Sequence, residues 1–388
     1  NPKSVLTAAQ RRRFELAKKE FDQPIVIVTE EEARENESVK ASGEKTWIFD
    51  AKNVRDFGWA SSRKFIWDAM AVKVGKKTPL AMSYYPKEGN PLWEKYSTKA
   101  VAQTLKTYSK HTIDYPYPVA ISVNAKSIGM EYPMICFNYG RCEKDGTYSE
   151  RTKYGMIGVI IHEVGHNFFP MIINSDERQW TWMDEGLNTF VQFLTEKEFD
   201  RDYPSRRGSA RNIRDYMGGD KTRISPIMTN SESIYQFGNN AYGKPATALN
   251  ILRETVMGRD LFDHAFREYS RRWAFKHPSP ADFFRTMDVA NGLDLRRRLV
   301  NGPGAEEYQD QRIGSPAVRV SYTFKNGWEI DAFAQMFSPT ILPGMSLLNS
   351  SLVDINAACG PPYPSGTPKR WLLPTAMSAP KSPGASKS

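Results

Sequence analysis

One stretch of the chain constrains its fold more than any other: the apolar run 159–169, V-I-I-H-E-V-G-H-N-F-F. Its two histidines, His162 and His166, are four positions apart, which places both on one face of an α-helix, one turn after the other. Both imidazoles can therefore reach a single metal ion. Glu163 lies about 100° further round such a helix, near enough to reach a water molecule at that ion without binding the ion itself.

A tetrahedral catalytic metal site needs a third protein ligand. The sequence offers one in Glu185, which follows His166 after eighteen intervening residues and opens a second predicted helix in W-T-W-M-D-E-G-L-N-T-F. The plainer alternative is a buried helix that holds two histidines for packing. That alternative is disfavoured, because two histidines and a glutamate inside an apolar run are costly to bury unless they are hydrogen-bonded or bind a metal.

Four motifs together resemble the gluzincin family of aminopeptidase N and leukotriene hydrolase. The first two are H-E-x-x-H and, after eighteen residues, W-M-D-E-G. Gly129-Met130-Glu131 lies upstream, where the family has a G-A-M-E-N strand, and Tyr242 lies downstream in A-Y-G-K-P, where the family has Y-x-K-G. The motifs occur in family order, and the resemblance covers roughly residues 45–295.

The resemblance implies an α+β fold, a thermolysin-like and mostly helical catalytic domain with a small edge sheet. It also implies one Zn²⁺ per chain, held by His162, His166 and Glu185, with Glu163 as general base and then general acid. Tyr242 would stabilise the oxyanion that forms at the peptide carbonyl. Without the motif, Tyr242 would be taken for a packing residue, since the chain has 18 tyrosines.

The motif Gly129-Met130-Glu131 indicates which kind of peptidase the chain would be. By the resemblance, Gly129 and Met130 offer a sheet edge to the substrate backbone, and Glu131 binds the substrate's free amino group. A solvated loop carboxylate is the plainer interpretation of Glu131. Three functions stay open: an aminopeptidase, a zinc endopeptidase that needs no free amino terminus, and a non-catalytic scaffold. The sequence departs from the family motif at Ile128, Gly129 and Tyr132, which weakens inference about the first substrate residue.

Three regions of different character follow one another along the chain. Residues 1–85 are predicted to be strands after one short helix and resemble the last part of an N-terminal β-domain, so that the chain would be a fragment lacking most of it. Residues 86–295 carry all four motifs and are predicted to form the metallopeptidase domain. Residues 296–388 lose helical patterning, are rich in Pro, Gly and Ser, and are predicted to be mostly disordered. An out-of-frame end of the coding sequence is the alternative.

Periodicity and capping signals predict the elements within the first two regions. A capping box at Thr7 and Gln10 starts a helix at about 8–20, and Asn90-Pro91 starts another. The predicted strands are 24–29, 46–50, 56–60, 69–73, 117–123 and 133–137. The further predicted helices are 154–169, 184–198, 246–256, 261–273 and one from Ser279 to about 290.

The composition excludes few classes of protein, but it indicates which binding partners are favoured. The net charge of +9 invites a nucleic-acid or membrane interpretation, yet Lys and Arg are interspersed with acids and no recognition motif accompanies them. A solvated surface, with peptides as substrates, is favoured. No apolar run is long enough to span a membrane. Three cysteines without a C-x-x-C pair predict neither a disulfide scaffold nor a cysteine metal site, although Cys136 and Cys142 could close a small loop. The resemblance slightly favours a location in the bacterial periplasm or cell envelope.

Overall fold

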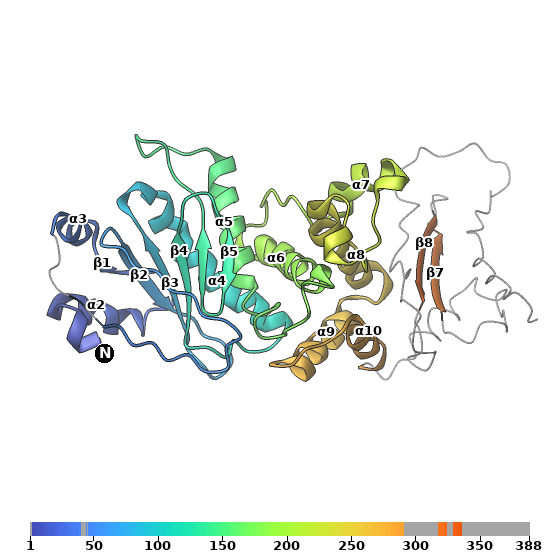
Figure 1. Cartoon of the computed structure of the whole chain (residues 1–388), viewed down its shortest axis with the longest axis horizontal. Helices are drawn as coiled ribbons and strands as arrows, with labels where there is room; N and C mark the ends of the chain where they lie inside the picture. The colour runs from blue at the N-terminus through green and yellow to red at the C-terminus, as the bar shows by residue number, and fades with distance from the viewer. Residues whose placement is uncertain (1, 40–43, 45, 291–316, 324–328, 336–388) are drawn as a thin grey trace, which may run out of the picture.

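The structure is a computed structural model that describes residues 2–39, 44, 46–290, 317–323 and 329–335. A mixed six-stranded sheet forms one side of the molecule, and helices cover both of its faces (Figure 1). The strand order is β1-β2-β3-β4-β6-β5. The strands are β1 (Ile25–Val28), β2 (Ile66–Ala71), β3 (Leu80–Tyr85), β4 (Val119–Asn124), β5 (Met130–Tyr132) and β6 (Ile135–Asn138). The α+β fold class expected from the sequence is confirmed.

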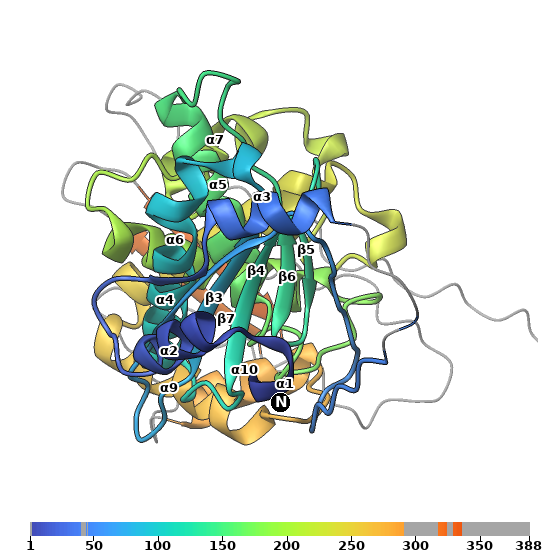
Figure 2. The same cartoon turned by 90° about the vertical axis from the view of Figure 1, so that its left-hand side faces the viewer.

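The sheet is parallel at its centre and antiparallel at its margins. β4 pairs in parallel with β3 and with β6, whereas β1, β2 and β5 join antiparallel. β5 is therefore the last strand at one edge (Figure 2). Its register with β6 sets Glu131 opposite Cys136, and a side chain opposite another lies on the same face of the sheet. Glu131 is thereby on the same face of the sheet as Cys136, which is part of the main hydrophobic core.

The helices follow the sheet in the sequence, apart from three near the N-terminus and α4 (Leu92–His111), which lies between β3 and β4. Those three are α1 (Pro2–Val5), α2 (Ala8–Ala17) and α3 (Glu30–Ser38). The larger helices are α4 (Leu92–His111), α5 (Glu150–Gly165), α6 (Glu185–Phe199), α7 (Ala210–Gly218), α8 (Lys244–Ile251), α9 (Arg259–Trp273) and α10 (Pro280–Val289). Two π-helices, η5 (Gly238–Gly243) and η6 (Leu252–Val256), flank α8. Short 3₁₀ turns are η1 (Lys87–Gly89), η2 (Thr181–Met183), η3 (Lys221–Arg223) and η4 (Ser231–Ser233).

Two hydrophobic cores hold the sheet, one on each face. The main core packs α4, α5 and α6 against one face, with large buried side chains such as Trp93, Tyr108 and Phe168. The smaller core packs Ala17 of α2 against alanines and a methionine of β2 and β3 on the other face. Period-two alternation in β2 and β3 separates the residues of the two cores.

The first metal-binding helix is well specified by its own sequence. Ser149 caps α5 by accepting a hydrogen bond from the Thr152 backbone nitrogen at 3.1 Å. The apolar face that follows is fully buried, as Ile157, Ile160 and Ile161 all have no exposed surface. Gly165 lets α4 and α6 come close, since a Cβ there would overlap the Tyr108 hydroxyl and the Asn188 side chain.

Several sequence predictions for residues 1–85 are corrected by the structure. No strand forms at 46–50 or 56–60, where Trp47, Ile48 and Trp59 are exposed and no neighbouring strand pairs with the backbone. The prediction missed α3, which starts at a capping box of Thr29 and Glu32. It also missed β3, whose partner β4 lies beyond residue 85. The sheet therefore continues across the predicted domain boundary, although the division into domains stays a prediction.

The predicted tail contains one described element. β7 (Ala317–Thr323) and β8 (Glu329–Gln335) form an antiparallel pair over their full length. These two segments are regular structure, and the disorder predicted for the tail as a whole stays a prediction. The remainder of residues 296–388 lies outside the described residues.

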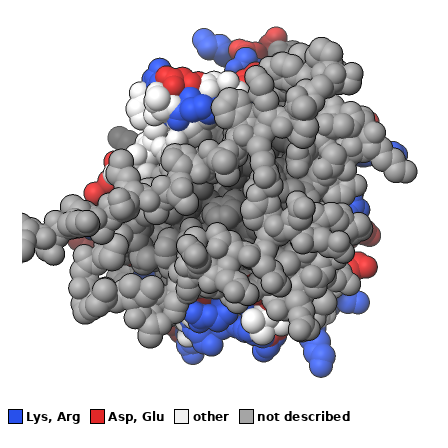
Figure 3. Space-filling view, turned by 90° about the vertical axis from the view of Figure 1, so that its right-hand side faces the viewer, with Lys and Arg blue, Asp and Glu red and all other residues white. Residues whose placement is uncertain are grey.

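Charged side chains of both signs reach the described surface. In the face viewed in Figure 3, Lys and Arg lie beside Asp and Glu at the upper margin, and a group of Lys and Arg lies at the lower margin. Many are paired; examples are Arg13 with Glu32 at 2.6 Å and Arg55 with Glu177 at 2.7 Å. Such exposed pairs contribute little stability each, about 0–1 kcal/mol.

Candidate metal centre

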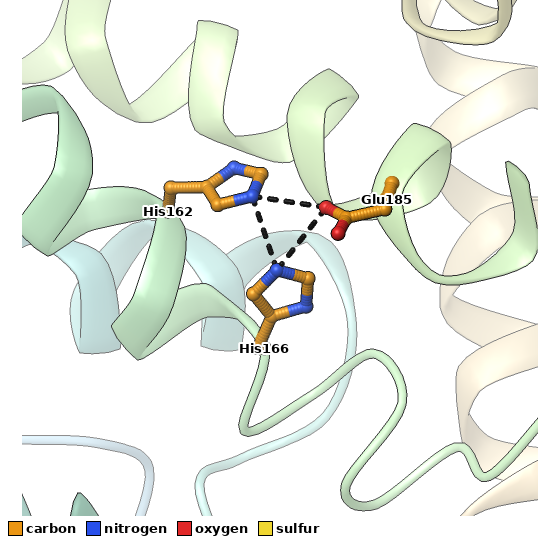
Figure 4. Close-up of side chains that lie close together, drawn as sticks. All are labelled: His162, His166 and Glu185. Atoms are coloured by element: carbon orange, nitrogen blue, oxygen red, sulfur yellow. Dashed lines mark hydrogen bonds and ion pairs between the residues drawn. The ribbon is translucent and has the colours of Figure 1, made fainter. Parts of the chain in front are cut away.

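Two histidines and a glutamate from two helices converge at one point (Figure 4). The Nε2 atoms of His162 and His166 are 3.0 Å apart. Glu185 Oε2 lies 3.0 Å from His162 Nε2 and 3.3 Å from His166 Nε2. His162 comes from the last turn of α5, His166 caps that helix, and Glu185 is the first residue of α6. The structure thus brings together the three ligands expected from the sequence.

The spacing of these atoms fits a tetrahedral zinc site. Two ligand atoms about 2.1 Å from zinc at a tetrahedral angle lie about 3.4 Å from each other. The three observed separations are about 0.1 to 0.4 Å below that value. A bound ion would therefore need only a small outward movement of the side chains.

The other nitrogen of each imidazole is held by an oxygen atom. His166 Nδ1 lies 2.7 Å from the Phe169 carbonyl oxygen and 2.9 Å from Asp184 Oδ1. His162 Nδ1 lies 2.8 Å from Gln192 Oε1. A proton on each Nδ1 satisfies these oxygens and leaves both Nε2 lone pairs free for a metal ion. This tautomer is the one that a zinc site requires.

Gln192 is itself fixed, so its oxygen faces His162. The Gln192 amide nitrogen donates to the Gly158 carbonyl at 3.2 Å and to Glu196 at 2.8 Å. Asn188 donates to the His162 carbonyl at 2.9 Å, and its own oxygen accepts from the Tyr108 hydroxyl at 2.6 Å. Buried networks of this kind lock the orientation of the metal ligands.

Electrostatics around the histidines favour a cation. Asp184, Glu131 and Glu185 raise the pKa of His166 well above its usual range, outweighing the burial that lowers it. Burial raises the pKa of Asp184 to about 7 against the opposing charge of His166. Burial also acts to raise the pKa of Glu185, but His166 and His162 hold it well below its usual range. The carboxylates around the site thus favour positive charge, which a bound ion supplies.

Glu163 is buried beside the ligands and accepts no hydrogen bond from any residue that the structure describes. Burial raises the pKa of its carboxyl to about 7, while the charges of His162 and His166 lower it. A carboxyl with a pKa near neutrality can both accept and release a proton at physiological pH. The geometry therefore suits the general base predicted at this position.

Glu131 reaches the site from the edge strand β5. Ligand atoms of Glu131, Glu163 and His166 all lie within 4.8 Å of one another. Among the described residues, Glu131 has neither a hydrogen-bond partner nor an ion-pair partner. Its carboxylate is partly exposed and available to a positively charged group.

The neighbours of Glu131 in the motif occupy the edge itself. Gly129 lies so close to α5 that a Cβ would come within 2.5 Å of Glu163 Oε1 and 2.8 Å of Val159 Cγ2. Met130 begins β5 and is 39% exposed. Since β5 pairs only with β6 among the described strands, its outer backbone groups can accept an added strand.

Tyr242 contacts two members of the ligand set, Glu185 and His162. It lies in the π-helix η5, and its hydroxyl donates to Glu185 Oε1 at 2.6 Å. Its ring packs on that of His162 with centroids 5.6 Å apart. Burial, with the charge of Glu185, raises the pKa of Tyr242 above its usual range, so the hydroxyl stays a donor. π-helical turns occur often at functional sites.

The sequence prediction missed the residues that support the ligands. Asn188, Gln192 and Glu196 follow Glu185 at intervals of three, four and four, which places all four on one face of α6. That polar stripe on a buried helix was a usable signal. The Phe169 carbonyl had no signal, because the backbone turn after His166 determines its position.

A mixed sheet beside helices that hold His162, His166 and Glu185 around a free Glu163 defines a site of the zinc-peptidase class. Comparison with protein families is more specific. The "Peptidase family M1 domain" matches residues 96–301, more than half of the chain. The chain belongs to peptidase family M1, and the resemblance drawn from its four motifs is confirmed.

The chain is also similar to individual aminopeptidases. "Probable aminopeptidase 1" of Sulfurisphaera tokodaii is 23% identical over 210 residues, which are 50% of this chain and 26% of the relative. "Aminopeptidase 2" of Candida albicans is 22% identical over 260 residues, or 61% of this chain and 26% of the relative. The chain therefore spans about a quarter of the length of these relatives.

Two further comparisons concern a solved structure and a second protein family. The M1 zinc metallopeptidase from Deinococcus radiodurans aligns with a TM-score of 0.45 and 20% identity, over 58% of this chain and 48% of that one. A second family, "Protein of unknown function (DUF1302)", matches residues 280–366. Among the described helices, none is both long and apolar enough to cross a bilayer.

Proposed function

We propose that this chain is a zinc-dependent aminopeptidase, which removes N-terminal residues from peptides. Membership of peptidase family M1 supports a peptidase, and the geometry of His162, His166 and Glu185 supports zinc as the metal. When bound, the ion would polarise the scissile carbonyl and make a water molecule more acidic. All remaining steps fall to side chains of the chain itself.

Glu131 and β5 would position the substrate. The substrate's ammonium group pairs with the free carboxylate of Glu131, while the backbone of its first residue pairs with the outer edge of β5. A fixed carboxylate at this point holds the first peptide bond over the ligand set, because the carboxylate lies within 4.8 Å of both Glu163 and His166.

Glu163 and Tyr242 would carry the proton and the charge. Glu163 accepts the proton of the attacking water as the carbon–oxygen bond forms, and then passes it to the leaving nitrogen as the carbon–nitrogen bond breaks. Tyr242 turns its hydroxyl from Glu185 to the carbonyl oxygen, where negative charge develops. The products are a free amino acid and a peptide with a new amino terminus.

A single observation carries the choice of aminopeptidase over endopeptidase: the unpartnered carboxylate of Glu131 beside the ligand set. A peptidase that cleaves within chains would have to bury an uncharged backbone against that carboxylate, which is unfavourable. The intact ligand set and Glu163 argue in the same way against a non-catalytic scaffold.

The test is hydrolysis of a panel of aminoacyl amides and their N-acetylated counterparts, with and without a zinc chelator. We expect chelator-sensitive cleavage of the free amines alone. Cleavage of the acetylated set at a similar rate would instead support the endopeptidase. Absence of cleavage by a chain that holds one zinc would contradict the proposal.

A further inference from the structure

A hollow of about 450 Å³ lies beside Tyr242, between α7, η5 and α8. Ligand pockets in proteins typically measure about 300–1,000 Å³, so the hollow can hold one or two amino-acid residues. Phe237 and Asn239 on its wall belong to η5 or adjoin it, the same π-helix that carries Tyr242. The hollow is therefore connected to the metal site by a continuous backbone segment.

The wall of this hollow is positively charged. Among the described residues, the charged ones on its wall are Arg206 and Arg207, and none of its lining residues carries a carboxylate. Neither arginine forms an ion pair with a residue in the part of the chain that the structure describes. Arginine is the side chain best suited to bind a carboxylate through two parallel hydrogen bonds. The chemistry of the hollow thus fits a carboxylate.

Arg207 is held close to the reacting groups. Its guanidinium carbon lies 4.3 Å from the centre of the Tyr242 ring, a cation–π contact. The next residue, Gly208, has a φ of +90°, and a Cβ there would overlap the Phe193 ring. Glycine at this position lets the loop turn tightly over α6 and leaves Arg207 directed at Tyr242.

The hollow lies on the Tyr242 side of the ligand set, since Arg207 on its wall contacts the Tyr242 ring. Glu131 groups with Glu163 and His166, whereas Tyr242 contacts Glu185 and His162. The two thus contact different members of the ligand set. With its amino group at Glu131 and its first carbonyl at the ligands, a peptide that continues past them toward Tyr242 reaches the hollow.

We propose that Arg207, with Arg206 beside it, forms a subsite for a carboxylate on the leaving part of the substrate. The inference rests on the proposed aminopeptidase function and adds a preference to it. The carboxylate has two possible sources: the C-terminus of a dipeptide, or the side chain of an acidic second residue. In either case the enzyme favours peptides that carry negative charge just after the cleaved bond.

Binding measurements test the subsite without turnover. The full chain carrying Glu163→Gln is loaded with zinc and titrated calorimetrically with two matched pairs of ligands. The first pair is alanyl-alanine and its amide; the second is alanyl-glutamate α-amide and alanyl-glutamine α-amide. For at least one pair, we expect the acid to bind about tenfold or more tightly, as is typical of charge-assisted hydrogen bonds. The pair that shows the preference identifies the source of the carboxylate.

Variants then assign the preference to Arg207. Adding Arg207→Gln brings the ratio of the two dissociation constants close to one, and Arg207→Lys gives an intermediate ratio because it keeps the charge without the paired donors. Arg211→Gln is the matched control, since Arg211 is exposed on α7 and does not line the hollow. It leaves the ratio unchanged.

The results separate this inference from the proposed function. Equal binding of acid and amide in both pairs, or a preference that survives Arg207→Gln, overturns the subsite. The acid can be preferred in an Arg207-dependent way while the wild-type chain cleaves none of these ligands. That result contradicts the aminopeptidase proposal but supports the subsite.

Discussion

Two buried carboxyls of this protein share a raised pKa but differ in everything else. Burial raises the pKa of both Glu163 and Asp68 to about 7. Asp68, in β2, accepts hydrogen bonds from Tyr85 at 2.6 Å and from Thr98, and it lies among the hydroxyl groups of the sheet. Glu163 accepts none from the described residues and faces two histidines. A raised pKa therefore marks a buried carboxyl, whereas the missing partner marks one that is available for chemistry.

Asp68 ends a row of polar side chains that crosses the sheet. Register places it opposite Ser83, Ser83 opposite Ser122, and Ser122 opposite Cys136. Ser97 of α4 joins the row by a 2.7 Å hydrogen bond to Ser83. Because these groups hydrogen-bond within the row and to its neighbours, the row has a structural role. One end of the sheet's inner face is therefore structural, and the other end belongs to the metal site.

The largest expected effect is at Glu163. We expect Glu163→Gln to lower kcat by about 10³-fold or more, since the amide cannot accept the proton of water. The zinc content stays near that of the wild type, because Glu163 is not among the ligands. Loss of zinc in the variant would show that the division of roles is wrong; metal analysis of the purified chain measures it.

Asp68→Asn tests whether the hydrogen-bonded carboxyl of Asp68 affects stability and not catalysis. Because the pKa of Asp68 is raised on folding, its contribution to stability is fully present below about pH 4 and is lost as the pH rises through about 7. The slope is about 1.4 kcal/mol per pH unit. In Asp68→Asn this loss disappears, so the variant gains stability relative to wild type with rising pH, while kcat stays within about twofold.

Guanidinium unfolding of both proteins between pH 4 and 8 measures this difference. Asp215→Asn is the control, since Asp215 is exposed and its change should shift stability by less than about 0.5 kcal/mol at any pH. A difference between Asp68→Asn and wild type that does not vary with pH would contradict the assignment.

Glu131→Gln tests whether the carboxylate of Glu131 binds the substrate's ammonium group. We expect kcat/KM for free aminoacyl amides to fall about 10- to 100-fold, because a charge-assisted bond to the ammonium group is lost. KM rises more than kcat falls if Glu131 chiefly binds substrate. If the variant cleaved free and acetylated substrates as the wild type does, Glu131 would be a solvated carboxylate and not an anchor.

Gln192→Ala should give the smallest effect. Removing the oxygen that orients His162 Nδ1 is expected to weaken zinc binding about tenfold, with little change in kcat at saturating zinc. Competition with a chromogenic chelator measures the affinity. Gln179→Ala, at an exposed glutamine outside the site, should leave the affinity unchanged.

The ligand helices could be predicted because their information is local. The spacing of His162 and His166 and the apolar run around them suffice to place both side chains on one buried face. The cap at Ser149, by contrast, lies five residues before the predicted start of the helix, so the predicted boundary is wrong although the helix is right.

Other features depend on contacts that no local pattern encodes. The apolar residues at 46–50 look like a strand, yet a strand needs a partner, and none pairs with them. The direction of Glu131 follows from its register with Cys136. Arg207 is one of several basic residues between 201 and 223, and only the fold of the loop distinguishes it by placing it on Tyr242.

The cysteines are a further example of a feature that the local sequence does not determine. Cys136 and Cys142 are close enough in sequence to close a loop, but both are free thiols. Cys136 is buried in the polar row behind the site, where burial, more than any neighbour, raises the pKa of its thiol above the usual range.

The continuity of the sheet has a practical consequence for anyone who shortens this protein. The family match begins at residue 96, and a shortened gene that starts there would look complete by sequence alone. It would lose β1, β2 and β3 together and strip β4 of its parallel neighbour, leaving a buried strand as an open edge prone to aggregation. An expression boundary before β1 keeps the sheet whole.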